Sequence, residues 1–321
     1  MTERAAYERL EDELSAWIGE PHVHVVACSS GTAALHLALE AMRLPLGSSV
    51  VTGEFSMIAV PRAIVMAGHK PVFTDCNDAL LMKKYFTIGP ADAAVVVHIY
   101  GRKCEHITSM TVIEDMAEVH GVKPQSSSFA ATYSFYRNKI VNGAEGGAVA
   151  FRDPDAAAHA RSLRSLGFTE DHDFRHLERG FNARLSNEHA ELIRASLANV
   201  DENLEKRAQV AAWYDKAVPI DWRMPPRDVD WVYDLRIRSE GFDNASVVRT
   251  LNNQGIQARL AFKPMSMQAE FFDPSYEQLN AYRMSREVLY LPVYPDMTES
   301  EVGVNVNALK DAVAIGHRST A

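Results

Sequence analysis

The segment VHVVACSSGTAALHLALEAM, residues 23–42, is the clearest indication of the fold class of this 321-residue chain. VHVVA (23–27) is a short β-branched run typical of a buried strand, CSSGT (28–32) is a turn of small residues, and AALHLALEAM (33–42) has the composition of a helix. Further short apolar runs follow at SVVTG (49–53), KPVFTD (70–75), AAVVVHIYG (93–101), TVIED (111–115), FAATYSF (129–135) and AVAF (148–151). Strands of this kind, separated by helical or loop segments, are typical of a mostly parallel sheet buried on both faces, so we predict an α/β fold.

The flanking segments predict two domains. An amphipathic helix is expected over 3–18, and helical patterns follow over 153–166 and, with one break at most, over Ser186–Lys216. Beyond residue 219 the pattern mixes a helix (244–254), the run LYLPVYP and a last helix that begins at the capping signal Thr298-Glu-Ser-Glu301. We therefore expect a large α/β domain, 1–215, and a small C-terminal α+β domain, 216–321.

Composition excludes several classes of protein. The net charge of −9 provides no global positive field for nucleic acid or an anionic membrane, and 47% apolar residues are far too many for a disordered chain. Three cysteines without C-x-x-C spacing indicate neither a disulfide framework nor a zinc site, and twelve histidines without H-E-x-x-H predict no metal site. With no export signal or apolar run of eighteen residues, we expect a cytoplasmic protein.

Three motifs are weak signals separately and indicate a functional site only in combination. Ser30-Gly31-Thr32 lies between a predicted strand and a predicted helix, where an anion can bind, although small residues also make ordinary turns. Asp115 ends a predicted strand and faces the edge where open α/β sheets bind ligands, although an aspartate there is often a helix cap. Lys139 ends the pattern S-x-x-x-x-K that begins at Ser134 and precedes Glu145-Gly-Gly.

In this order the motifs supply what a pyridoxal phosphate enzyme requires. They are a cup for the phosphate, an acid for the pyridine nitrogen and an amine for the Schiff base. With them the chain resembles the DegT/StrS-type pyridoxal-phosphate-dependent aminotransferases, a fold-type-I family that acts mainly on nucleotide-linked keto sugars. The residues that carry the resemblance are SSGTAALHLALEA (29–41), GHKPVFTD (68–75), HIYG (98–101), VIEDMAEVHG (112–121), SFYRNK (134–139), EGG (145–147), GFNARLSNEHAELIRASL (180–197) and LYLPVYPDMTESEV (289–302).

The resemblance implies the roles of two catalytic residues. Lys139 would form the internal aldimine and later move the proton between the substrate carbon and the cofactor carbon. Asp115 would keep the pyridine nitrogen protonated, which makes the ring an electron sink.

The resemblance also implies how the phosphate is bound. Ser30, Gly31, Thr32 and Ser134 would bind it from one subunit, and Asn182 would reach the phosphate of the neighbouring subunit. A homodimer with shared active sites is therefore expected.

The chain departs from the family pattern in four places. Its opening helix begins near Met1, where the family has a further segment, so part of the substrate pocket is expected to be missing or replaced. Only ten residues, 102–111, separate HIYG from the next strand, so a thinly covered sheet face is expected. Met57, or Phe55 in its place, stands where the family stacks an aromatic ring on the cofactor, and Glu118 replaces the usual Gln or His beside the cofactor's phenolic oxygen.

Several alternatives stay open at the level of sequence. The leading reaction is amino transfer, with glutamate as donor, to a keto group of a nucleotide-linked sugar or similar carbonyl substrate. A decarboxylase, lyase or dehydratase using the same cofactor on a nucleotide-linked or amino-acid substrate is the alternative, and a non-catalytic regulatory homologue is the third.

His98 either borders the site or is a structural histidine, and Arg259 either binds a carboxylate or is exposed. The Arg and His residues of 172–184 either recognise an anionic substrate or form a charged interface loop.

Overall fold

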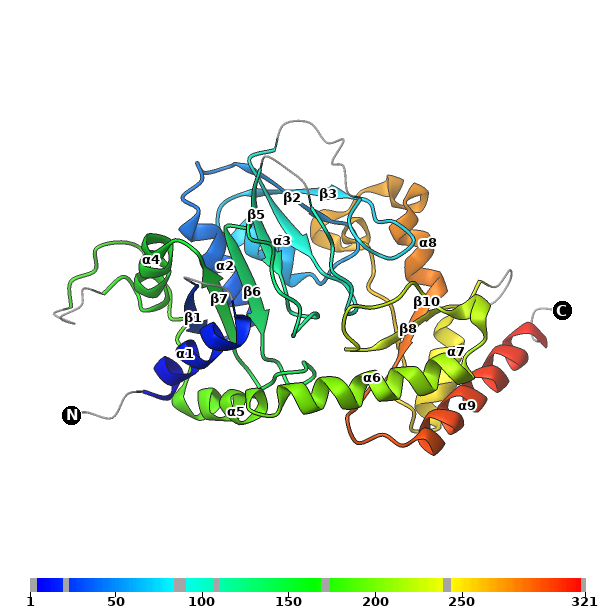
Figure 1. The fold of residues 1–321 in the computed structure, drawn as a ribbon. Helices are drawn as coiled ribbons and strands as arrows, with labels where there is room; N and C mark the ends of the chain where they lie inside the picture. The colour runs from blue at the N-terminus through cyan, green and yellow to red at the C-terminus, as the bar shows by residue number, and fades with distance from the viewer. Residues whose placement is uncertain are drawn as a thin grey trace.

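A seven-stranded sheet forms the centre of the larger part of the molecule (Figure 1). Its strand order is β1-β7-β6-β5-β4-β2-β3. The bounds are β1 His24–Cys28, β2 Ser49–Gly53, β3 Lys70–Thr74, β4 Ala93–Val97, β5 Thr111–Asp115, β6 Ala130–Ser134 and β7 Gly147–Phe151. The computed structural model describes residues 5–19, 23–83, 91–106, 110–168, 174–238 and 244–318. The predicted strands are confirmed within one residue at their ends, except that β4 ends at Val97, four residues before the end of the predicted run 93–101.

The predicted mostly parallel sheet is confirmed, with β7 as the exception. Strands β3, β2, β4, β5 and β6 pair in parallel, whereas β7 is antiparallel to both β6 and β1. Gly147, the first residue of β7, pairs with Cys28 on one side and Ser134 on the other. The ends of β1 and β6 therefore meet the start of β7 at one edge of the sheet. A Cβ on Gly147 would lie 2.3 Å from the Ser30 carbonyl oxygen, so this approach requires glycine.

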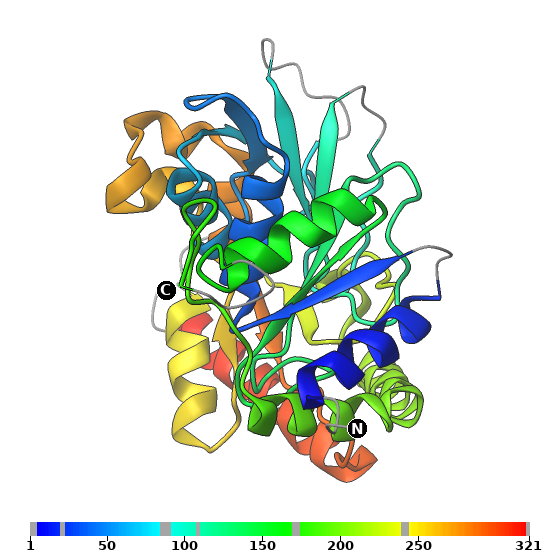
Figure 2. The same cartoon turned by 90° about the vertical axis from the view of Figure 1, so that its left-hand side faces the viewer.

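Helices cover the sheet and extend away from it. Helix α2 packs on β6 and β7, while α1 and α4 lie beside β1 (Figure 1 and Figure 2). Helices α5 and α6 follow each other and reach from α1 to the C-terminal part of the chain, with one short break between them, as the sequence predicts. The bounds are α1 Ala6–Ile18, α2 Gly31–Ala41, α3 Ala59–Met66, α4 Pro154–Arg164, α5 Asn187–Leu197 and α6 Val200–Ala217. No described helix is long and apolar enough to cross a bilayer.

The C-terminal part has its own antiparallel sheet and core. Strand β10 (Val288–Leu291) lies between β8 (Tyr233–Arg236) and β9 (Arg259–Leu260), and α7 (Asn244–Asn253) and α9 (Glu299–Arg318) pack together beside it. The capping signal predicted at Thr298 is present, since its Oγ1 accepts the Glu301 N–H and its own N–H donates to the Glu301 carboxylate. Strands β8 and β9 and the short 3₁₀ helices, at Ile220–Trp222, Met265–Met267, Ala269–Phe271 and Pro274–Gln278, were not predicted.

The predicted boundary between the two domains, 215/216, falls inside helix α6. Val210, Ala211 and Tyr214 of α6 belong to the C-terminal core, although α6 begins beside the large sheet. A division at 215/216 thus stays a prediction.

A segment of the C-terminal part packs on the short connection after β4. The carbonyl of Gly101 accepts the N–H groups of Asp228 and Val229 at 2.8 and 3.0 Å. Gly101 has φ +82°, and a Cβ there would lie 1.8 Å from the Val229 carbonyl oxygen. Beside it, Arg102 binds Asp234 with two nitrogens at 2.7 and 2.9 Å, and both side chains are buried. Residues 225–234 thus hold the described part of this connection; residues 107–109 lie outside the described chain.

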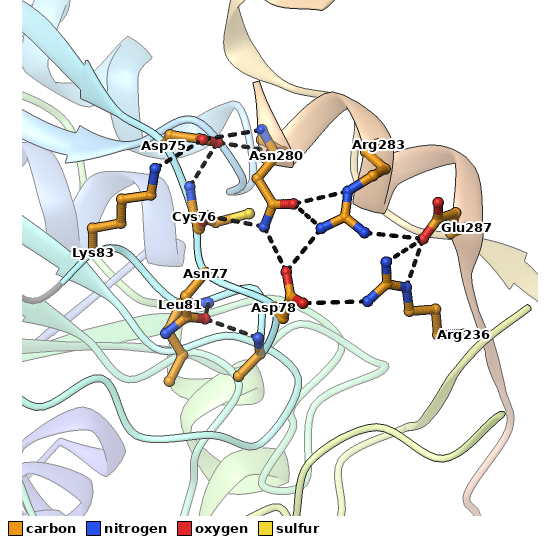
Figure 3. Close-up of polar contacts among 12 residues, drawn as sticks. Asp75, Cys76, Asn77, Asp78, Leu81, Lys83, Arg236, Asn280, Arg283 and Glu287 are labelled. Atoms are coloured by element: carbon orange, nitrogen blue, oxygen red, sulfur yellow. Dashed lines mark hydrogen bonds and ion pairs between the residues drawn. The ribbon is translucent and has the colours of Figure 1, made fainter. Parts of the chain in front are cut away.

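A second contact between the large sheet and the C-terminal part joins Asp75, the residue after β3, to helix α8 (Asn280–Glu287), as Figure 3 shows. The Asp75 carboxylate accepts the N–H groups of Asn280 and Ala281 at 3.0 and 2.9 Å, so it caps a helix about two hundred residues further along the chain. Burial alone would raise the pKa of Asp75, but these two N–H groups and the Lys83 ammonium lower it below its usual value. The pairs of Asp78 with Arg236 and Arg283 extend the contact.

Candidate active site

Most of the predicted site residues line one cavity at the carboxyl edge of the sheet. It has a volume of about 350 Å³ and is also bordered by aromatic side chains of the C-terminal part. The predicted residues that line it are Ser30, Gly31, Thr32, Met57, Asp115, Glu118, Ser134 and Lys139. They come from turns far apart in sequence, which the parallel strands bring to the same edge.

The first turn of α2 forms the anion-binding end of the cavity. Ser30 is the N-cap, and its Oγ accepts the Ala33 N–H at 3.1 Å. The first N–H groups of a helix have no hydrogen-bond partner within the helix, and they lie at the positive end of the helix dipole. A Cβ on Gly31 would lie 2.7 Å from the Ser134 Cβ, so the glycine lets β6 approach this turn closely. The arrangement suits a phosphate group.

Asp115 provides a buried carboxylate at the end of β5. Its Oδ1 accepts the Ala117 N–H at 3.1 Å. Burial raises the pKa of Asp115, while the Ala117 N–H and the Lys139 ammonium oppose that rise. A cationic group of a ligand beside this carboxylate would favour its ionised form.

Lys139 lies in the connection between β6 and β7, and its ammonium lies between two side chains. Its Nζ is 3.7 Å from Glu118 Oε1 and 4.1 Å from the centroid of the Trp231 ring. The Trp231 indole N–H donates to the carbonyl of Asn138, the residue before Lys139, at 2.7 Å. Sequence reasoning missed Trp231, because the segment that carries it has no motif.

Glu118 is a second buried acid in the cavity. Its Oε2 accepts the Tyr100 N–H at 2.9 Å. Burial raises the pKa of Glu118 to about 7; Lys139 and the Tyr100 N–H oppose this rise, whereas the negative charge of Asp115 adds to it. The carboxyl group of Glu118 therefore titrates near neutral pH.

The structure separates the two candidates for the stacking residue. Met57 lines the cavity and is 49% exposed. Phe55 is buried, packs against Tyr100 and Phe262, and is not among the lining residues. The aromatic rings that do line the cavity, in addition to Trp231, are Tyr136, Phe262 and Tyr290.

His98 both borders the cavity and has structural hydrogen bonds, the two alternatives that its sequence position allowed. It borders the cavity but is fully buried, with Nδ1 accepting the Cys104 N–H at 2.9 Å. Its Nε2 therefore carries the hydrogen and donates to Glu114 at 3.0 Å. Burial alone would raise the pKa of Glu114, but hydrogen bonds from His106, His98 and Ser128 hold it well below its usual range. Arg259 is exposed on β9 and does not line the cavity.

Asn182 is not among the residues that line the cavity of Lys139. It borders a separate hollow of about 380 Å³ together with Tyr7, Arg164 and Arg184. Its role toward a neighbouring subunit stays a prediction. Of the charged stretch 172–184, residues 172 and 173 lie outside the described chain, and Arg175, His176 and Arg179 are exposed.

The cavity fits pyridoxal phosphate on three observations. A helix N-terminus lies at one end, Asp115 offers a buried carboxylate at the end of a strand, and Lys139 brings an amine into the same space. No group of three His, Cys, Asp or Glu suited to a metal ion occurs among the described residues.

Comparisons with known proteins agree with this geometry. A model of the DegT/DnrJ/EryC1/StrS aminotransferase family matches residues 2–310. GDP-perosamine synthase of Caulobacter vibrioides is 32% identical over 317 residues, which are 89% of this chain and 85% of that protein. UDP-N-acetyl-3-dehydro-alpha-D-glucosamine 3-aminotransferase of Acidithiobacillus ferrooxidans is 27% identical over 324 residues, 91% of this chain and 85% of that protein.

Solved structures agree on the fold. The sugar aminotransferase Spr1654 of Streptococcus pneumoniae in its PMP form, described as putative, superposes with a TM-score of 0.87 at 18% identity, covering 98% of this chain and 93% of that one. NtdA of Bacillus subtilis with bound PMP gives a TM-score of 0.83 at 23% identity, covering 98% and 78%. The predicted fold type I is confirmed.

Proposed function

Because this chain belongs to the DegT/DnrJ/EryC1/StrS aminotransferase family of pyridoxal-phosphate-dependent enzymes, we propose that it aminates a keto group of a nucleotide-linked sugar, with Lys139 as the residue that carries the cofactor. The observation that supports this assignment is the convergence of Lys139, Asp115 and the first turn of α2 on one cavity. Amino transfer is the family's reaction, so it is favoured over decarboxylation, elimination and dehydration and over a purely regulatory role.

Each residue has a task that follows from its position. When bound, pyridoxal phosphate supplies an electron-withdrawing ring that stabilises negative charge on the substrate carbon. Ionised Asp115 holds the ring nitrogen protonated, and Ser30, Gly31, Thr32 and Ser134 bind the phosphate. Lys139 binds the cofactor covalently and, once released, moves a proton at the reacting carbon.

The names of two relatives support the substrate class. One is a GDP-perosamine synthase, and the other is named for a UDP-linked 3-dehydro sugar. We assign glutamate as the amino donor. The thiols of Cys28, Cys76 and Cys104 are buried and form no disulfide among the described residues, which suits a reducing cytoplasm, where we place the protein.

We also propose a homodimer with shared active sites. Asn182 is not among the residues that line the cavity of its own chain, yet it lies in the segment that resembles the family's cross-subunit loop. The amide of Asn182 would donate to the phosphate in the partner's cavity.

The test is a product assay with matched cofactor mapping. Purified protein, pyridoxal phosphate and glutamate are incubated with GDP- and UDP-linked keto sugars, and the aminated sugar is detected by mass spectrometry. Borohydride reduction followed by peptide mapping should place the cofactor on Lys139, and Lys139→Ala should lose both the adduct and the product. Amination of free keto acids but of none of the nucleotide-linked sugars would refute the substrate class, and cofactor fixed to another lysine would refute the residue assignment.

A further inference from the structure

The C-terminal sheet carries one row of polar side chains on the face that lies away from its own core. Asp234 on β8, Tyr290 on β10 and Arg259 on β9 are direct partners in the antiparallel register. Side chains at directly opposed positions lie on the same face of a sheet. The other face is apolar, with Leu289 and Leu260 in the C-terminal core or packed against it. Arg259 therefore shares a face with Asp234 and Tyr290.

This row extends from the interior of the molecule to the rim of the active-site cavity. Asp234 is buried and binds Arg102 in the connection after β4, whereas Tyr290 is half-buried and lines the cavity. Burial raises the pKa of Tyr290 to about 12, and the Arg259 charge opposes that rise, because the guanidinium lies near the phenol. Arg259 is exposed, and its side chain forms no hydrogen bond or ion pair with another described residue. A free cation thus stands at the rim.

The cavity behind this rim has little positive charge of its own. Asp115, Glu118 and Glu145 line it, and Lys139 is the only lysine or arginine among its described lining residues. That lysine is assigned to the cofactor. The net charge of −9 gives the chain no general attraction for an anion. A substrate that carries a diphosphate therefore needs a cation outside the cavity.

The size of the cavity decides which part of the substrate meets Arg259. Its volume of about 350 Å³ is at the lower end of the roughly 300–1,000 Å³ of small-molecule pockets, and bound cofactor takes up part of it. The keto carbon of the sugar must reach Lys139, and the amino donor carries its α-carboxylate on the reacting carbon, so both lie inside. The diphosphate is attached at the anomeric carbon, across the ring from the keto group. It therefore extends past the rim.

We propose that Arg259 is a substrate-binding residue whose guanidinium binds the diphosphate of the nucleotide-linked sugar at the rim of the cavity. A guanidinium can donate two parallel N–H groups to phosphate oxygens, which gives this contact direction as well as charge. The inference rests on the proposed function in one respect, the nucleotide-linked substrate. It adds a residue of the C-terminal part to a site whose other assigned residues all come from the large sheet and its connections.

The experiment measures nucleotide binding without turnover. GDP and UDP, which carry no sugar, are titrated separately into cofactor-loaded protein in an isothermal calorimeter at about 50 mM salt. Arg259→Gln should weaken binding of the nucleotide that the wild type prefers at least tenfold. Arg259→Lys keeps the charge but loses the paired N–H groups, so its affinity should lie between the two. Because salt screens an exposed contact, the difference between wild type and Arg259→Gln should shrink at about 0.5 M salt.

A control variant and a donor assay make the result specific. Arg249 is exposed on α7, which packs beside β9 and β10 on the side of the C-terminal core. Arg249→Gln removes the same charge from the other face and should leave nucleotide affinity within twofold of the wild type. The KM for glutamate, followed by the absorbance of the cofactor, should also stay within twofold in Arg259→Gln. Circular dichroism confirms the fold of each variant.

The outcomes separate failure of this inference from failure of the proposed function. Unchanged nucleotide binding in Arg259→Gln, an equal loss in Arg249→Gln, or a rise in the KM for glutamate with nucleotide affinity unchanged would overturn the role of Arg259. Absence of GDP and UDP binding to the wild type would overturn it as well. If Arg259→Gln weakens nucleotide binding but no nucleotide-linked sugar is aminated, the proposed reaction fails and the assignment of Arg259 to a nucleoside diphosphate stands. Amination with unchanged nucleotide binding in Arg259→Gln refutes the inference alone.

Discussion

Replacing Arg102 by methionine should destabilise the protein by breaking a buried ion pair between its two parts. The guanidinium binds both oxygens of Asp234 at 2.7 and 2.9 Å, and its Nε and Nη2 donate to the Pro225 carbonyl at 3.0 and 2.7 Å. Removal of one member of a buried pair costs about 3–5 kcal/mol, because the other charge is left without compensation. Asp234 keeps one bond from Arg227 at 3.1 Å, so we expect a loss of about 3 kcal/mol, at the lower end of that range.

The assay is urea unfolding followed by far-UV circular dichroism at a fixed, saturating concentration of pyridoxal phosphate, since ligand binding adds to the apparent stability. Lys206→Met is the matched control, because it removes a lysine from an exposed pair with Glu202 and should have a much smaller effect. The double variant Arg102→Met, Asp234→Leu should lose less than the sum of the two single variants, because it leaves no unpaired charge at this position.

The same substitution should also affect the active site. Residues 225–234 carry Trp231, whose ring contacts Lys139, so loosening this segment should also lower product formation in the amination assay. A loss below 1 kcal/mol, or additive single and double variants, would refute the reasoning that this pair joins the two parts of the molecule.

Three further perturbations test other parts of the structure. Asp75→Ala removes the cap of α8 and should lower the free energy of unfolding by about 1 kcal/mol, measured with urea at pH 7. Because the fold lowers the pKa of Asp75, the difference in unfolding free energy between wild type and variant should be present above the usual carboxyl pKa and vanish as the pH falls through the pKa of the folded state. A difference that grows in acid would contradict this role. Asp115→Asn should retain cofactor, measured by absorbance, but reduce turnover roughly 10²-fold or more, because a neutral amide cannot hold the ring nitrogen protonated; unchanged turnover would exclude that role. Asn182→Ala should weaken cofactor binding roughly ten- to a hundredfold, through loss of about 1.5–3 kcal/mol of binding free energy. If the Asn182→Ala and Lys139→Ala variants are each inactive alone, co-refolding them should restore activity. Confirmed heterodimers without activity would argue against a shared site.

Local sequence patterns were sufficient for the large sheet and for most of the cavity. Short β-branched runs mark strands, and the residues that follow them lie at the carboxyl edge of a parallel sheet regardless of the details of packing. For that reason Ser30, Asp115 and Lys139, which are far apart in the chain, were expected to meet, and they line one cavity.

Tertiary packing alone decided what surrounds these residues. The return of β7 against β6, the contact of Trp231 with Lys139 and the pairing of Arg102 with Asp234 join residues up to 132 positions apart. Such contacts leave no periodicity in the sequence, because each depends on how separate elements dock and not on the repeat of one element. Glu118 illustrates both levels. The resemblance to the family implies that Glu118 lies near the cofactor, but the shift of its pKa to about 7 arises from burial, which exists only in the folded protein.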